Sequence, residues 1–129
     1  MSYRFTKHYT LDEARALLPQ VREWLKDLQN TGEALRKVDQ QLLQMHRWGG
    51  DLGGPQVHAW LHLNLKCTEL LAEFERRQIL IKDVQRGLVD FPSLRGDREI
   101  FLCWEMDEED IQFWHELDAG YAGREAIEE

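Results

Sequence analysis

The sequence lacks the basic surplus that is typical of nucleic-acid-binding proteins. It contains 24 acidic and 16 basic residues, which give a formal net charge of −8, and acids and bases are interspersed along the chain. Affinity for nucleic acids comes largely from neutralising phosphates, so this composition predicts no nucleic-acid partner. We expect such an acidic chain to bind another protein or a small ligand.

Cysteines and long apolar runs are also scarce. Cys67 and Cys103 lie far apart and form no CxxC pair, which excludes a disulfide framework and favours free, buried thiols in a reducing compartment. No apolar run reaches the roughly 18 residues needed to span a membrane, and residues 1–10 contain no signal-peptide core. These absences predict a cytoplasmic protein without a membrane partner.

The first half of the chain carries a long helical pattern. Thr10 and Glu13 form a capping box, in which the hydroxyl and the carboxylate satisfy free backbone N–H groups at a helix start. The following seam residues recur in steps of three and four: Ala14, Leu17, Val21, Trp24, Leu28, Thr31, Leu35, Val38, Leu42 and Met45. This spacing is typical of a coiled coil and predicts a helix from Leu11 to about Arg47, with a kink near Pro19.

A glycine cluster separates this helix from a second one. Four of the six residues 49–54 are glycine, and Pro55 suits the first turn of a new helix. The 3-4 rhythm then resumes and predicts a helix from Pro55 to about Arg77. Two long helices joined by a short loop predict an antiparallel hairpin over residues 10–77.

From Gln78 onward the pattern changes to short runs that favour strands. Residues 79–82, 88–91 and 99–105 are separated by turn signals and predict a small antiparallel meander. The alternative is that the second helix continues to about Val84 and leaves a single β-hairpin.

Four acids at 107–110, followed by apolar residues and Gly120, predict a short C-terminal helix. The whole chain 1–129 is therefore expected to be one α+β domain. It consists of a coiled-coil-like helical hairpin (10–77) and a cap of meander plus helix (78–124).

Carboxylates and one histidine in this cap form the first candidate site. Asp90, His115, Glu116 and Asp118 are candidate ligands of a divalent metal, with Glu105 as a weaker member, because carboxylates and imidazoles form two-carboxylate, one-histidine sites. The alternative is that His115 donates to Asp118 or Asp90 and only ties the last helix to the sheet.

Asp90, Trp104 and Arg124 form a candidate ligand-binding set. Glycines before Arg124 permit close backbone approach, and its guanidinium can bind a carboxylate or a phosphate. The alternative is an internal salt bridge from Arg124 to Asp90 or Asp118.

Catalytic chemistry has less support. His58 and His62 share a helix face, but Ala59 stands where a zinc protease motif requires glutamate, so we expect two solvated histidines. Cys103 lies among apolar neighbours, where a thiol stays protonated. No catalytic residue and no cofactor beyond a divalent metal is predicted, and a non-enzymatic role is favoured over an enzyme.

Two blocks of the cap, GLVDFPSLRGDREIFLCW (87–104) and FWHELDAGYAGR (113–124), carry a family resemblance. Together with the opening FTKHYTLDEARALLPQVREWL (5–25), they are similar to a bacterial family of uncharacterised proteins, domain of unknown function 2203. Glu105 departs from that family's pattern, in which the residue after LCW is often basic or neutral. The resemblance implies relatedness and no particular activity.

The seam of the long helix exceeds what the shorter second helix can cover. An uncovered apolar stripe predicts self-association, most simply a two-fold dimer through the hairpin. The leading functional hypothesis is thus a non-enzymatic, self-associating interaction or assembly module. The alternative is a small metal- or ligand-binding protein that uses the carboxylate, histidine and arginine cluster of the cap.

Overall fold

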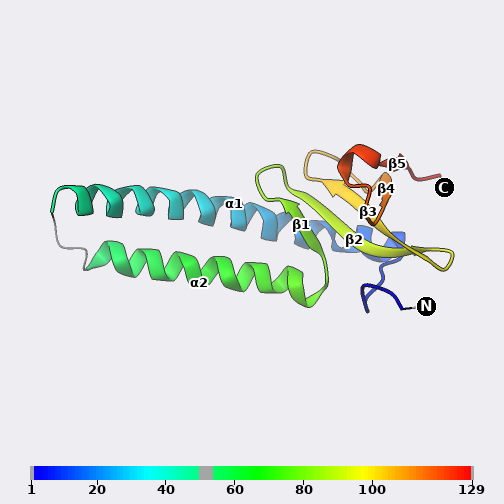
Figure 1. Ribbon diagram of the computed structural model, residues 1–129, viewed down its shortest axis with the longest axis horizontal. Coiled ribbons are helices and arrows are strands. Elements are labelled where there is room, and N and C mark those ends of the chain that lie inside the picture. The colour runs from blue at the N-terminus through cyan, green and yellow to red at the C-terminus, as the bar shows by residue number, and fades with distance from the viewer. Residues whose placement is uncertain (1, 50–53, 129) are drawn as a thin grey trace.

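The computed structural model describes residues 2–49 and 54–128, which form two long helices and one antiparallel sheet (Figure 1). Helix α1 (Leu11–Arg47) and helix α2 (Pro55–Arg76) lie side by side and run in opposite directions, close to the predicted bounds. The predicted glycine loop falls largely on residues 50–53, outside the described residues. Neither helix in the described part of the chain is long and apolar enough to cross a membrane.

Helix α1 begins at the predicted capping box. The Thr10 hydroxyl accepts from the Glu13 N–H at 3.1 Å, and the Glu13 carboxylate accepts from the Thr10 N–H at 2.9 Å. Within Leu11–Arg47, all of which is described, the buried residues are Ala14, Leu18, Val21, Leu25, Leu28 and Thr31. The first half of α1 therefore packs into the core, whereas its second half extends beyond the sheet as part of a long arm (Figure 1).

The strands form a meander, as predicted. In the described part of the chain they are β1 (Leu80–Asp83), β2 (Leu88–Arg95), β3 (Arg98–Glu105), β4 (Phe113–Glu116) and β5 (Glu125–Ala126). Each pairs antiparallel with the next, in the order β1-β2-β3-β4-β5. The alternative of a second helix reaching Val84 is wrong, because α2 ends at Arg76. Gly87 makes the β1–β2 turn at φ +67°, where an added Cβ would lie 2.5 Å from the Met106 side chain.

The predicted C-terminal helix is wrong, because residues 113–116 form strand β4. The acids before it bond locally: Glu108 accepts from the Glu105 N–H at 2.9 Å, and Asp110 accepts from the Ile111 N–H at 2.8 Å. Such side-chain-to-backbone bonds favour turns over helices. The edge of β3 left open by this turn is then covered by β4, which leaves fewer unpaired backbone groups. Beyond β4 the chain forms a 3-10 turn at Tyr121–Gly123.

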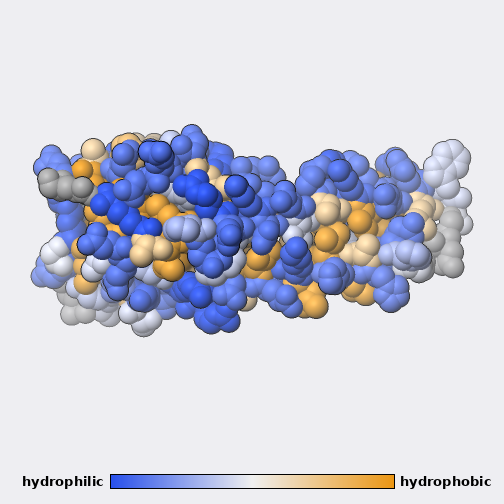
Figure 2. Space-filling view, turned by 180° about the vertical axis from the view of Figure 1, so that it is seen from behind, coloured by the Kyte–Doolittle hydropathy of each residue, from blue (hydrophilic) through white to orange (hydrophobic). Residues whose placement is uncertain are grey.

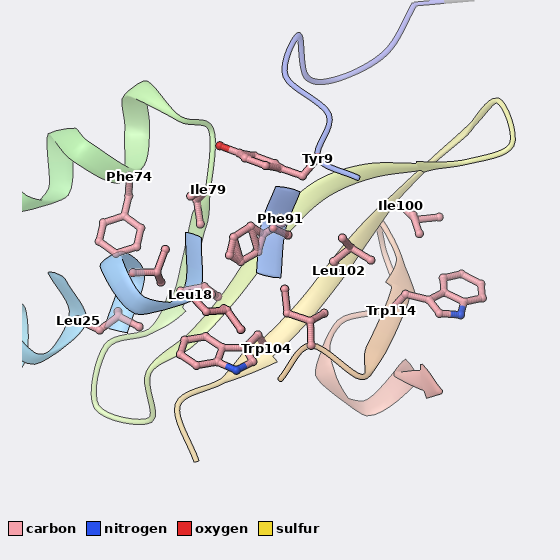
Figure 3. Packing of buried hydrophobic residues seen from close by; sticks show 14 of the residues in the cluster. Tyr9, Leu18, Leu25, Phe74, Ile79, Phe91, Ile100, Leu102, Trp104 and Trp114 are labelled. Carbon is pink, nitrogen blue, oxygen red and sulfur yellow. The ribbon is translucent and has the colours of Figure 1, made fainter. Parts of the chain in front are cut away.

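The two faces of the sheet have different surroundings. The front face packs against α1 and Tyr9 in one apolar core (Figure 3). Its buried strand residues are Val89, Phe91, Ile100, Leu102, Trp104 and Trp114. On the back face, the N-terminal segment (residues 2–9) covers one part, where the rings of Phe5 and Phe101 lie 5.5 Å apart.

Glu99 holds this N-terminal segment against the sheet. Its carboxylate accepts from the backbone N–H groups of Arg4 (2.8 Å) and Phe5 (3.0 Å), and His8 Nε2 lies 2.6 Å from Oε2. Burial alone would raise the pKa of Glu99, but the bonds from His8 and the two N–H groups outweigh it and hold the pKa below its ordinary value.

We therefore expect Glu99→Gln to lose about 1.5–3 kcal/mol of stability at pH 7, the typical value of a hydrogen bond to a charged group. A carboxyl whose pKa falls on folding stabilises the protein above its unfolded pKa, and this contribution disappears as the pH falls through the lower, folded pKa. Urea denaturation at pH 7 and near pH 3 checks this, because the two proteins should converge in acid. A difference that is equal at both pH values would rule the carboxylate out as its source.

Candidate functional site

Three adjacent strands bring Asp90, Cys103 and His115 together on the back of the sheet. Asp90 on β2 lies directly opposite Cys103 on β3, and His115 on β4 lies opposite Phe101, two residues before Cys103 on β3. Alternation along the strands puts all four side chains on one face. Asp90, Cys103 and His115 are each only 1% exposed, and one ligand atom from each lies within 4.8 Å of the other two.

The orientation of His115 is set by its neighbours. Nδ1 lies 2.7 Å from the Glu116 backbone carbonyl, which can only accept, so Nδ1 carries a hydrogen. Nε2 therefore faces Asp90, with 3.0 Å to Oδ1. Asp90 is one of the two partners predicted for His115. The contact joins two strands of the sheet, however, whereas the prediction had it tie a helix to the sheet.

The second carboxylate oxygen of Asp90 is in an unusual position. Oδ2 is buried and has no hydrogen-bond partner of standard geometry among the residues that the structure describes, although the Cys103 thiol lies close enough to the Asp90 carboxylate to interact with it. Leaving a buried acceptor unsatisfied typically costs about 1–3 kcal/mol, and more for a charged group. The cluster therefore has spare capacity to bind a proton or a cation.

Cys103 completes the cluster as a protonated thiol. Burial, and then the negative charge of Asp90, raise the pKa of Cys103 to about 12. A thiol in such surroundings is a poor nucleophile at neutral pH. Arg124 Nη1 lies 3.9 Å from its sulfur, and its positive charge lowers the pKa of the thiol but does not outweigh burial and the charge of Asp90.

Arg124 forms an internal salt bridge, but its predicted partners are wrong. Its two terminal nitrogens lie 3.3 and 2.9 Å from the two carboxylate oxygens of Glu108. The guanidinium also stacks on the rings of Phe113 and Tyr121, 3.9 and 4.3 Å from their centroids. Glu108 reaches it because the turn after β3 lies beside the C-terminal segment, so the guanidinium fork is already occupied.

Two of the predicted metal ligands, Glu116 and Asp118, lie outside the cluster. Because residues 113–116 form a strand, Glu116 points to the opposite face from His115, and it pairs with Arg98 at 2.9 Å. Asp118 is exposed and lies 3.5 Å from Arg4. The weaker member, Glu105, pairs with Arg86 at 2.7 Å.

Trp104 also lies away from Asp90 and Arg124, in the core on the front face. It is 0% exposed, its indole N–H donates to the Glu108 carbonyl at 3.0 Å, and the Arg22 guanidinium lies 4.8 Å from its ring. The predicted ligand-binding set is therefore split between the two faces of the sheet. His58 and His62 are exposed on α2.

Sequence reasoning missed Cys103 as a member of the site, although a signal for it exists. The turn at Gly96 and Asp97 pairs Arg95 with Arg98, and counting back along both strands places Asp90 opposite Cys103. A hairpin register is set by its turn in this way. The turn residues thus predict the contact once both strands are assumed.

A separate cavity of about 490 Å³ opens between the start of α1 and the far end of the sheet. Several of its polar side chains already have partners within the fold. Ser93 donates to the Tyr9 carbonyl at 2.5 Å, His8 meets Glu99, and Arg95 stacks on Trp114 at 4.5 Å. The back-face cluster is therefore the better candidate site.

Comparison with known proteins identifies the family of this chain. A sequence profile described as an uncharacterized conserved protein, DUF2203, matches residues 7–127, nearly the whole chain. The chain belongs to the DUF2203 family. This confirms the resemblance seen in the two cap motifs and in the opening segment. No curated protein and no solved structure matches this DUF2203 protein.

Proposed function

We propose that this DUF2203 protein is a self-associating module whose hairpin arm pairs with the arm of a second copy. The hairpin arm comprises residues 32–47 of α1 and 55–71 of α2, which extend beyond the sheet (Figure 1). The observation that carries the proposal is a second apolar stripe on α2, on the side away from α1 and the core.

Helix α2 is apolar over more than one face. Phe74 is its buried residue, and Leu70 packs against the core beside it. At about 100° per residue, Leu61 and Leu65 project on the opposite side, where they are 54% and 58% exposed, and Leu71 between the two sides is 42% exposed. A surface helix needs one apolar stripe, so the second stripe favours burial against another molecule.

The arm also lacks a core of its own. Among its described residues, none is classed as buried, and the two helices are linked by a hydrogen bond from the Trp60 indole to Asp39 at 2.9 Å. Apolar side chains gather along this arm between polar margins (Figure 2). Isolated helices gain most of their stability from packing an apolar face, so a partner would stabilise the arm.

Charge indicates that the partner is a second copy. Two chains of net charge −8 repel each other, but the arm itself is nearly neutral. It carries four basic residues, Arg36, Lys37, Arg47 and Lys66, and three acidic residues, Glu33, Asp39 and Glu69. Repulsion between copies is therefore lowest where the apolar stripe is exposed, and two antiparallel hairpins can form a two-fold four-helix bundle.

We expect the wild type to be a dimer at micromolar concentration and the double variant Leu61→Glu/Leu65→Glu to be a monomer. A dimer buries four of these leucines, and at roughly 1.5 kcal/mol each their loss weakens association by about 6 kcal/mol, or about 10⁴-fold. Light scattering coupled to size-exclusion chromatography measures the mass directly.

The control is His62→Glu, which adds a single negative charge, half that of the double variant, on the polar side of α2 and should leave the dimer intact. A wild-type protein that is monomeric at micromolar concentration would overturn the proposal. So would a double variant that stays dimeric, because the interface would then lie elsewhere.

Binding of a metal or small ligand in the cap is the second candidate function. The observation that favours it is the buried Asp90 oxygen without a hydrogen-bond partner among the described residues. Of the carboxylate, histidine and arginine cluster predicted from the sequence, Asp90 and His115 lie together. Arg124 is not available to a ligand, because it is paired with Glu108.

A further inference from the structure

We propose that Asp90, Cys103 and His115 form a binding site for a thiophilic divalent cation of the zinc class. The inference rests on the second candidate function and deepens it, since a cysteine ligand takes the place of Glu116 and Asp118. The three donors come from β2, β3 and β4, and each is nine-tenths buried or more.

The donor set matches the preferences of Zn²⁺. This ion binds cysteine sulfur, histidine nitrogen and carboxylate oxygen in tetrahedral sites at about 2.0–2.3 Å, which places neighbouring ligand atoms about 3.3–3.8 Å apart. Here the three atoms already lie within 4.8 Å of one another. Side-chain shifts of about 1 Å in Asp90 and Cys103 would close the remaining difference.

The surroundings of the ligands resemble the outer shell of a metal site. A metal-bound histidine usually donates its other ring N–H to a carbonyl or carboxylate, and His115 Nδ1 does so to the Glu116 carbonyl at 2.7 Å. This bond aims the Nε2 lone pair at the cluster. Arg124, held by both oxygens of Glu108, lies 3.9 Å from the Cys103 sulfur and can donate to a thiolate there.

Charge in the buried cluster also favours a divalent cation. A doubly charged ion bound to one carboxylate, one thiolate and one neutral imidazole gives a neutral site, which a buried position tolerates best. On binding, the thiol proton and any proton shared by Asp90 and His115 leave to solvent, so the total charge is balanced. The Asp90 Oδ2 atom, which has no hydrogen-bond partner of standard geometry among the described residues, is available for the ion.

The C-terminal segment, residues 117–126, lies beside the cluster, since its Arg124 contacts the Cys103 sulfur. It is held by the two-residue strand β5 and by the 3-10 turn at Tyr121–Gly123. Segments with few buried apolar contacts open more readily than a core strand. A cation could therefore enter from this side or bind while the chain folds.

Cobalt(II) is the probe for the test, because it occupies zinc sites and its bond to a thiolate gives a near-ultraviolet charge-transfer band. Protein freed of metal with a chelator is titrated with Co²⁺, both directly and after refolding in its presence. We expect the band to saturate at one equivalent for the wild type and to be absent in Cys103→Ser. Cys67→Ser, which changes the second cysteine of the chain, on α2 and outside the cluster, should keep the full band.

Circular dichroism and thermal melting check that each variant is folded. His115 is changed to alanine, or to glutamine if the alanine variant does not fold. One equivalent of bound Co²⁺ without a thiolate band, lost on changing His115, would overturn the role of Cys103 and leave the second candidate function standing. Binding that is lost in His58→Ala/His62→Ala instead would place the ion on α2 and overturn the site. Wild-type protein that binds no Co²⁺ by either route would overturn both the inference and the metal-binding form of the second candidate function.

Discussion

His115→Ala is expected to lower the free energy of unfolding by about 3–5 kcal/mol at neutral pH, because it leaves the Asp90 carboxylate buried without its partner. The two side chains are 2% and 1% exposed and meet at 3.0 Å. Water cannot replace the lost partner without opening the back of the sheet. Urea denaturation followed by circular dichroism measures the difference.

The matched control for His115→Ala is Glu116→Ala. Glu116 is the next residue on the same strand, but it forms a partly exposed pair with Arg98. Surface ion pairs contribute about 0–1 kcal/mol, so this variant should be nearly as stable as the wild type. If the two variants lost the same stability, the His115–Asp90 contact would not be the cause.

A second change separates the Asp90–His115 contact from packing. Removing Asp90 as well, in Asp90→Ala/His115→Ala, takes away the unpaired charge, so the double variant should lose less stability than the two single variants added together. Additive losses would show that each residue acts through packing alone.

The second large effect is expected for Trp104→Ala, with a loss of about 3–5 kcal/mol in the free energy of unfolding. Trp104 is fully buried at the centre of the front-face core, where its ring lies among Leu18, Phe91 and other apolar side chains (Figure 3). Trp104→Phe should lose less, because it keeps most of the apolar volume and gives up the hydrogen bond to the Glu108 carbonyl.

Trp48→Ala is the control for Trp104→Ala, since this tryptophan is 88% exposed at the end of α1. Its change should stay within about 0.5 kcal/mol of the parent protein. Both substitutions are best compared in the Leu61→Glu/Leu65→Glu background, so that association does not contribute to the measured stability. Equal losses at the two positions would contradict the assignment of Trp104 to the core.

Local sequence signals predicted most of the fold. The capping box at Thr10 and Glu13 marked the start of α1, and the 3-4 spacing carried the helix to its observed end at Arg47. Turn residues such as Gly87 and Gly96 divided the meander correctly. These features depend on bonds and backbone angles within a few residues, so they can be read without knowing the rest of the fold.

The prediction of a C-terminal helix was wrong because residues 113–116 are held by a contact that is distant in sequence. Ile111, Trp114 and Asp118 have helical spacing, but the open edge of β3 pairs with residues 113–116. That pairing is a non-local contact, and no local periodicity reveals it. The error carried over to the site, because Glu116 and Asp118 were placed near His115 by a helix that does not exist.

The sequence by itself determined two long helices, a meander and the presence of a carboxylate and a histidine able to meet in the cap. Only the tertiary structure decided that Asp90 and His115 pair across β3, that Cys103 lies beside them, and that Trp104 points to the other face. The local backbone conformation of a residue depends mainly on the residue itself and on its neighbours along the chain. Which face of a sheet it occupies depends on strand pairing, where a shift of one residue exchanges the two faces.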